Sequence, residues 1–115
     1  MRFRSAMDVI DQGVCLLDRA SMRLIDANET VCRMSGYSRN ELFAVDLADF
    51  GIGSSEYLAT IFDALISGGP TYTQTAELRR NDGSPLAAMI DWRALKVVDT
   101  WIIVGVISAG SKQDR

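Results

Sequence analysis

Side chains that commonly carry out catalysis are scarce in this sequence. It contains no histidine, so the most frequent general base and the Ser-His and Cys-His nucleophilic pairs are missing. The glycine-containing segment 51–55 lacks the lysine of a phosphate-binding loop. These residue types favour a protein without catalytic activity.

Carboxylates remain as candidates for acid–base or metal chemistry. Asp26 precedes a predicted helix cap, whereas Asp46 and Asp49 lie in a predicted loop, and solvated or capping roles are commoner at such places. Their spacing does not form a metal-binding cluster, so we expect no metal. A small freestanding α+β enzyme of isomerase type stays open as an alternative. It would need an inward carboxylate with a raised pKa.

The two cysteines, Cys15 and Cys32, fall on a predicted strand and a predicted helix. This placement favours two small apolar core residues over a disulfide framework. We therefore expect neither thiol to form a disulfide.

Composition limits the class of protein. The chain has 115 residues, 48% of them hydrophobic, which suits one compact domain. With 12 basic and 15 acidic residues and a net charge of −3, it lacks the basic surface of a nucleic-acid-binding protein. The most apolar run, 101–107, is far shorter than the roughly 20 residues of a membrane helix, and no signal peptide is visible. We expect a cytoplasmic domain that binds neither membrane nor nucleic acid.

The stretch 13–42 predicts the elements that organise the first half. Two strands, 13–18 and 22–27, are joined by a short connection and followed by a helix that ends at a glycine. A second short helix starts within two residues through a capping box. The predicted caps are Asn28, Gly36, Ser38 and Glu41.

The second half predicts a helix and a meander of three strands. A helical turn and loop over 44–53 precede a helix capped by Ser54 or Ser55. The buried stripe of that helix is Leu58, Ile61, Phe62, Leu65 and Ile66. Strands over 71–80, 85–97 and 101–108 follow, with turns at 81–84 and 98–100.

This order of elements, an α+β arrangement of two strands, three helices and three strands, resembles a PAS domain. The residues that carry the likeness are Asp18, Ala27, Asn28, Val31, Met34, Gly36, Tyr37, Ser38, Glu41 and Leu42. The resemblance implies a five-stranded antiparallel sheet with helices on one face and an N-terminal flanking helix. We expect that helix over 1–12, the PAS domain over 13–109, and a linker over 110–115.

Alternation assigns the faces of the late strands. The apolar Ala76, Leu78, Ala88, Ile90 and Trp92 should point toward the helices, and the charged Glu77, Arg79, Asp91 and Arg93 away from them. The last strand is apolar on both sides, with Trp101, Ile103 and Ile107 on one face and Ile102, Val104 and Val106 on the other. Something should therefore cover its outer face.

Two covers are possible, an N-terminal amphipathic helix or a second subunit. The helix is indicated by an apolar stripe near the start of the chain. In the PAS family such a helix packs on the outer face of the sheet or against a second protomer. The predicted interface residues are Phe3, Met7, Ile10, Ile102, Val104 and Val106.

The cofactors of PAS domains can be compared with the interior. Haem usually needs an axial histidine, which is absent. A flavin photosensor of the light-oxygen-voltage (LOV) type needs a reactive cysteine where this chain has Leu47, and inward amides where it has Leu78, Ala88 and Ile107. We predict neither cofactor.

The interior is then either a filled core or a pocket for a small apolar ligand. If a ligand enters, the side chains of Tyr57 and Tyr72 and the indole N–H of Trp92 are the candidate polar contacts. The predicted pocket residues are Leu47, Tyr57, Ile61, Tyr72, Ala76, Leu78, Ala88, Ile90, Trp92 and Ile107.

The resemblance implies a sensory and dimerisation module of a bacterial signal-transduction protein. PAS domains of this kind lie upstream of histidine kinases, diguanylate cyclases or helix-turn-helix transcription regulators. We expect a homodimer through the outer sheet face and the N-terminal helix, with an output domain connected through the segment after residue 109.

Overall fold

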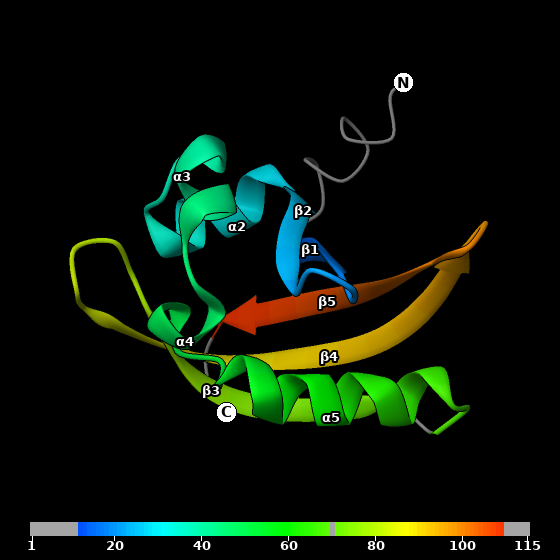
Figure 1. Cartoon of the computed structure of the whole chain (residues 1–115). Coiled ribbons are helices and arrows are strands. Elements are labelled where there is room, and N and C mark those ends of the chain that lie inside the picture. Colours follow the sequence, from blue (N-terminus) through cyan, green and yellow to red (C-terminus); the bar gives the residue numbers. More distant parts are fainter. Residues whose placement is uncertain (1–11, 70, 110–115) are drawn as a thin grey trace.

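A computed structural model describes residues 12–69 and 71–109 of the chain. They form an antiparallel sheet with helices inserted between its second and third strands (Figure 1). This is the α+β order that the sequence predicts. The elements are β1 (Gly13–Asp18), β2 (Arg23–Ala27), α2 (Glu29–Ser35), α3 (Arg39–Ala44), α4 (Leu47–Phe50), α5 (Ser55–Ile66), β3 (Tyr72–Arg79), β4 (Pro85–Val97) and β5 (Thr100–Ala109).

The sheet has the strand order β2-β1-β5-β4-β3, with every neighbouring pair antiparallel. β1 and β5, the first and last of these strands along the chain, are therefore neighbours at the centre of the sheet. Gly13 lies opposite Ile107 and Asp18 opposite Ile102. The long strand β4 joins this central pair to the β3 edge.

Asn28 fixes the start of α2 and connects it to the sheet. Its side-chain Oδ1 accepts hydrogen bonds from the backbone N–H of Val31 at 3.2 Å and of Val14 at 3.0 Å. Its Nδ2 donates to the carbonyl of Gln12 at 3.0 Å. The side chain is fully buried, so one predicted cap also binds β1.

The other predicted caps are also present. Gly36 ends α2 with a left-handed φ of 80°, and Ser38 and Glu41 form both bonds of the capping box of α3. Of the two serines considered for α5, Ser54 is the cap and accepts from the backbone N–H of Tyr57.

Several strand boundaries of β2, β3 and β5 differ by one residue from the predicted ones, and turn geometry explains two of them. Met22, predicted as the first residue of a strand, has a φ of 59° and donates its N–H to the carbonyl of Asp18 at 2.7 Å. It therefore belongs to the turn. In the last hairpin Val97 pairs with Thr100, so the turn contains only Val98 and Asp99, and β5 starts one residue earlier than predicted.

The core lies between the sheet and its helices. Inward residues of β1, β4 and β5 alternate with outward ones, as their burial shows. In Figure 1 helix α5 runs along β3 and β4, while α2 and α3 lie near β1 and β2. The largest fully buried side chains are Trp92, Phe62, Leu17, Leu42, Leu58, Ile90, Ile103 and Ile107.

Some expectations concern segments outside the described residues. They are the helix over 1–12, with Phe3, Met7 and Ile10, and the linker over 110–115. Within the described part, no helix is long and apolar enough to cross a membrane.

Candidate functional site

The interior holds most of the side chains predicted to line a pocket. Leu47 on α4 and Leu78 on β3 are buried, as are Ala88, Ile90 and Trp92 on β4 and Ile107 on β5. Ile61 and Ala76 are partly buried and pack against this cluster. The alternation that placed these residues inward therefore describes the sheet correctly.

The space around Trp92 is filled. The Phe62 ring packs edge-on against the indole, with ring centroids 5.0 Å apart. A Cβ added at Gly105, which lies opposite Trp92 on β5, would approach the indole to 2.6 Å and the Cys15 sulfur to 3.0 Å. This part of the interior is a packed core.

Gln74 on β3 is an inward polar residue that the sequence reasoning missed. Its Oε1 accepts a hydrogen bond from the Trp92 indole N–H at 2.8 Å, and its Nε2 donates to the carbonyl of Ile52 at 2.7 Å. The inward positions of the late strands therefore include an amide besides the apolar Leu78, Ala88 and Ile107. Gln74 has the same parity as Ala76 and Leu78, so alternation alone could have identified it.

Tyr57 and Tyr72 lie at the edge of the structure. Their hydroxyl groups are 3.2 Å apart, and Tyr57 is half-exposed. Tyr57 precedes Leu58 by one residue, which rotates it away from the buried face of α5. This pair joins α5 to β3; Tyr57 lies outside the core, whereas Tyr72 is partly buried and packs against the core cluster.

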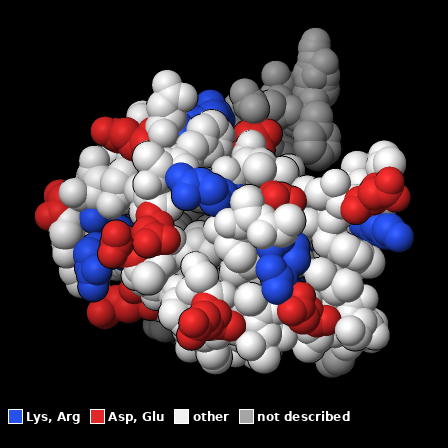
Figure 2. Space-filling model, in the orientation of Figure 1, with Lys and Arg blue, Asp and Glu red and all other residues white. Residues whose placement is uncertain are grey.

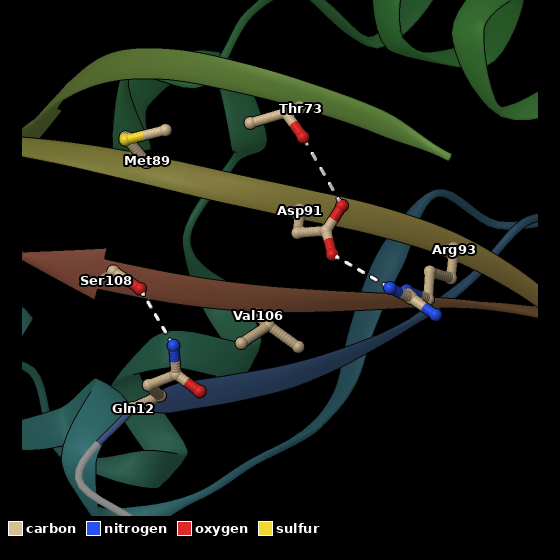
Figure 3. A pocket seen from close by; sticks show the side chains of 7 residues that line it. All are labelled: Gln12, Thr73, Met89, Asp91, Arg93, Val106 and Ser108. Carbon is tan, nitrogen blue, oxygen red and sulfur yellow. Dashed lines mark hydrogen bonds and ion pairs between the residues drawn. The ribbon is translucent and has the colours of Figure 1, made fainter. Parts of the chain in front are cut away.

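The outer face of the sheet carries a hollow of about 400 Å³. Figure 3 shows that its side chains come from β3, β4, β5 and the residue before β1. The hollow combines apolar, hydroxyl, amide and charged groups. The lining residues are Gln12, Thr73, Met89, Asp91, Arg93, Val106 and Ser108.

Asp91 is at the centre of the polar part of this hollow. Thr73 donates its hydroxyl to Asp91 Oδ1 at 3.5 Å, and an Arg93 guanidinium nitrogen lies 3.3 Å from Oδ2 (Figure 3). Gln12 donates to the Ser108 hydroxyl at 3.0 Å. Asp91 therefore faces away from the core, as predicted.

Next to the hollow, the outer face is apolar. Val104 and Val106 on β5 lie opposite Arg93 and Asp91 of β4 and opposite Leu16 and Val14 of β1. All four apolar side chains are partly exposed. They form an apolar strip at the centre of the outer face.

The interior lacks the ionised groups of an acid–base site. Among the described residues, the buried polar side chains are Asn28, Thr30 and Ser35, and no cluster of potential metal ligands occurs. Burial raises the pKa of the Cys15 thiol to about 12. Neither Cys15 nor Cys32 is disulfide-bonded.

Charges are mixed on the face shown in Figure 2. Basic and acidic side chains alternate across it without a continuous patch of one sign. This face has no electrostatic footprint for nucleic acid.

Comparison with known families adds the decisive observation. A family model described as "PAS domain" matches residues 1–66. This chain belongs to the PAS domain family. Its five-stranded sheet and inserted helices are the PAS fold, as the sequence predicts.

Solved PAS structures resemble the whole chain. The PAS domain of an HTR-like protein from Haloarcula marismortui has a TM-score of 0.79 at 15% identity, covering 95% of this chain and 89% of that one. A domain of a sensory box sensor histidine kinase/response regulator from Geobacter sulfurreducens has a TM-score of 0.73 at 23% identity, covering 91% and 89%.

A LOV protein is also similar in fold. The Rhodobacter sphaeroides LOV protein has a TM-score of 0.73 at 20% identity, covering 94% of this chain and 66% of that one. At such identities the likeness establishes the fold alone. No curated protein matches the chain in sequence.

Proposed function

We propose that this PAS domain is a non-catalytic sensory and dimerisation module of a cytoplasmic signal-transduction protein. The domain itself would comprise residues 13–109. Its signal would pass through the sheet to an output domain such as a histidine kinase, diguanylate cyclase or helix-turn-helix regulator. Similar folds in sensor histidine kinases support this class of output.

The apolar strip on the outer face is the observation that carries the proposal. Val14, Leu16, Val104 and Val106 lie together on neighbouring strands, on the side of the sheet opposite the buried core. A contiguous apolar surface of this kind is typical of an interaction site. The occupant that we propose is a second copy of the domain.

The interior has a secondary role in this proposal. Ala88 belongs to the packed core cluster and Ala76 packs against it, so these small side chains leave room for a ligand only if neighbouring core side chains move. A small apolar ligand would therefore bind by shifting the packing of the core toward a minor arrangement. The filled core without ligand remains the alternative.

Flavin and haem do not suit the side chains of this chain. Leu47 stands where a LOV domain has its reactive cysteine, and the one inward amide identified here, Gln74, is engaged by Trp92 and Ile52. Haem would need an axial ligand other than histidine. We therefore propose that the domain works without either group.

The enzymatic alternative has little support. An isomerase would need a carboxylate inside the cavity. Asp91 lies between two buried residues of β4, but its side chain faces outward beside Thr73 and Arg93. No observation on the described residues favours this second function.

The dimer can be tested by placing a charge on the apolar strip. We expect Val104→Glu to convert a dimer into a monomer, because the new carboxylate would lose water in the interface at a cost that exceeds its gain from Arg93 beside it on β4. Light scattering over a range of concentrations measures the mass. Thr75→Glu on β3 is the matched control, since it adds the same charge to an exposed outward position.

The control should keep the wild-type mass. Circular dichroism should give the same folded spectrum for both variants, because both positions face outward. A wild-type domain that stays monomeric at high micromolar concentration, or a Val104→Glu variant with unchanged mass, would contradict the proposal.

A further inference from the structure

We infer that two copies pair through their outer faces in one antiparallel register, in which Asp91 of each subunit contacts Arg93 of the partner subunit. The two-fold axis would cross β4 at the level of Trp92. This inference rests on the proposed dimer and specifies its geometry. In this dimer the contacts between Asp91 and Arg93 determine how the two sheets align and which partner is accepted.

The charges on the outer face are self-complementary. Asp91 and Arg93 are two residues apart on β4 and therefore share one face. In a two-fold interface, residue i of one subunit meets residue j of the other, and residue j meets residue i. An axis midway between Asp91 and Arg93 brings the carboxylate of each subunit to the partner's guanidinium, so that the contact occurs twice in the dimer.

The ion pair between Asp91 and Arg93 adds little stability to the monomer. Asp91 and Arg93 have exposed side-chain fractions of 35% and 63%, and one nitrogen–oxygen contact of 3.3 Å joins them. Water screens exposed pairs of this kind, so they add little to the stability of the folded monomer. In a covered interface the same charges lose water, so each needs an opposite partner, and a wrong register leaves them facing like charges.

The shape of the face agrees with this register. The hollow lies mainly on one side of Trp92, where Met89, Asp91 and Val106 line it, and it reaches Arg93 just past Trp92. On the other side Leu95 is 52% exposed. The proposed axis places Leu95 of each subunit opposite the partner's Met89, so that a projecting side chain meets the hollow.

The neighbouring positions follow the same rule. On β4, a residue of one subunit faces the partner's residue at the same distance from Trp92 on the other side. Ala87 therefore faces the partner's Val97. On β5, where Val106 and Val104 lie beside Asp91 and Arg93, each valine faces the partner's other valine. The apolar strip is then buried against itself, and the only charges at its centre are paired.

Charge reversal tests this register directly. We expect Asp91→Arg and Arg93→Asp each to weaken homodimerisation on the order of 10²-fold, because each variant places like charges opposite each other twice. Both side chains are solvent-accessible, so both variants should fold. Sedimentation equilibrium of each variant alone measures the loss.

Mixing the two variants supplies the decisive control. One variant carries two arginines and the other two aspartates at these positions, so the mixture should form a heterodimer close to wild-type affinity. The double variant Asp91→Arg/Arg93→Asp should again form a homodimer. A mixture that remains monomeric would overturn the inference.

The outcomes separate this inference from the proposed function. Homodimers of both single variants, with a dimeric wild type and a monomeric Val104→Glu variant, would overturn the register and leave the outer-face dimer intact. A monomeric wild type would overturn both. If the protein dimerises only after residues 1–11 are removed, this segment covers the outer face in place of a second copy. That outcome would also overturn the inference.

Discussion

Gln74 shows how one side chain connects the core to a loop. It bonds both the buried Trp92 indole and the Ile52 carbonyl at the end of the α4–α5 connection. Removing it leaves a buried donor and an acceptor without their partner, and an unsatisfied buried group costs more than a hydrogen bond contributes. Gln74 is therefore expected to stabilise the packing of β3 against Trp92.

Replacing Gln74 by alanine should lower the free energy of unfolding by about 1 to 3 kcal/mol. Urea denaturation followed by tryptophan fluorescence measures this change. Thr75→Ala, at the exposed neighbouring position, should stay within about 0.5 kcal/mol of wild type. Equal stability of Gln74→Ala and wild type would show that water replaces the amide.

Cys15 makes the stability of the domain depend on high pH. Its folded-state pKa is raised from 9.0 to about 12 by burial. Below pH 9.0 the Cys15 thiol is protonated in both the folded and the unfolded chain, so its contribution to folding stability is fully present. Between 9.0 and about 12 the unfolded chain loses the proton first, so stability falls by about 1.4 kcal/mol per pH unit from this group.

Cys15→Ala should remove that part of the pH slope. Chemical denaturation of both proteins at several alkaline pH values measures the difference, in which the shared titration of lysine and tyrosine cancels. Thiol labelling provides an independent check, because Cys15 should react only through unfolding while the half-buried Cys32 reacts in the native state. Rapid labelling of both thiols in the folded protein would contradict the assigned burial.

At the residue scale, the sequence identified the buried side chains well and their polar partners poorly. Alternation placed Trp92, Ile90 and Ala88 inward because a strand has a strict period of two. The same period also turns Gln74 inward, although the sequence analysis did not include it, and a polar residue in an apolar row has no predictable partner. The Ile52 carbonyl comes from a loop whose path depends on tertiary packing.

Among the elements, the β4–β5 hairpin contains a strained residue. Val98 has a φ of 56° and is 86% exposed at the tip of the turn. A left-handed conformation costs a β-branched residue about 1 to 2 kcal/mol, which glycine avoids. The native turn therefore holds an apolar side chain in water at a conformational cost.

Val98→Gly should therefore stabilise the domain by up to about 1 kcal/mol, after the extra chain entropy of glycine is subtracted. Thermal unfolding measures the shift. Val97→Gly, at a paired strand position with ordinary geometry, should instead destabilise it by about 0.5 to 1 kcal/mol. A loss of stability in Val98→Gly would mean that the valine side chain makes contacts that outweigh the strain.

Element types were more predictable than element boundaries. The caps Asn28, Gly36 and Ser38 are local chemical signals, so the sequence located them correctly. Met22 has no such signal, and only the bond to Asp18 makes it part of the turn. The second role of Asn28, binding Val14 and Gln12, depends on strand placement and could not be read locally.

For the whole molecule, dimerisation should appear in its thermal stability. If association through the outer face accompanies folding, the melting temperature should rise with protein concentration, because mass action favours the bound folded state. Calorimetry over a wide concentration range measures this dependence. In Val104→Glu the melting temperature should not change with concentration, and a wild-type melting temperature independent of concentration would contradict the association.

The order of strands in the sheet could be predicted only by resemblance. Neither hydrophobic periodicity nor turn signals indicate that β1 pairs with β5, since the two strands are separated by most of the domain. The exposed strip was predictable as a pattern, because Val104 and Val106 alternate with inward residues on β5, although Ile102, predicted on the same face, is buried. Its cover was not, because an intermolecular contact depends on residues outside the sheet itself.

The central β1–β5 pair has a consequence for biosynthesis. A ribosome releases the chain from its N-terminus, so β1 emerges long before the strand that must bind beside it. Until residue 109 has left the exit tunnel, one edge of β1 remains open to other nascent chains. Productive folding is thus postponed to the end of translation of this domain, and chaperones should engage the half-made sheet during that interval.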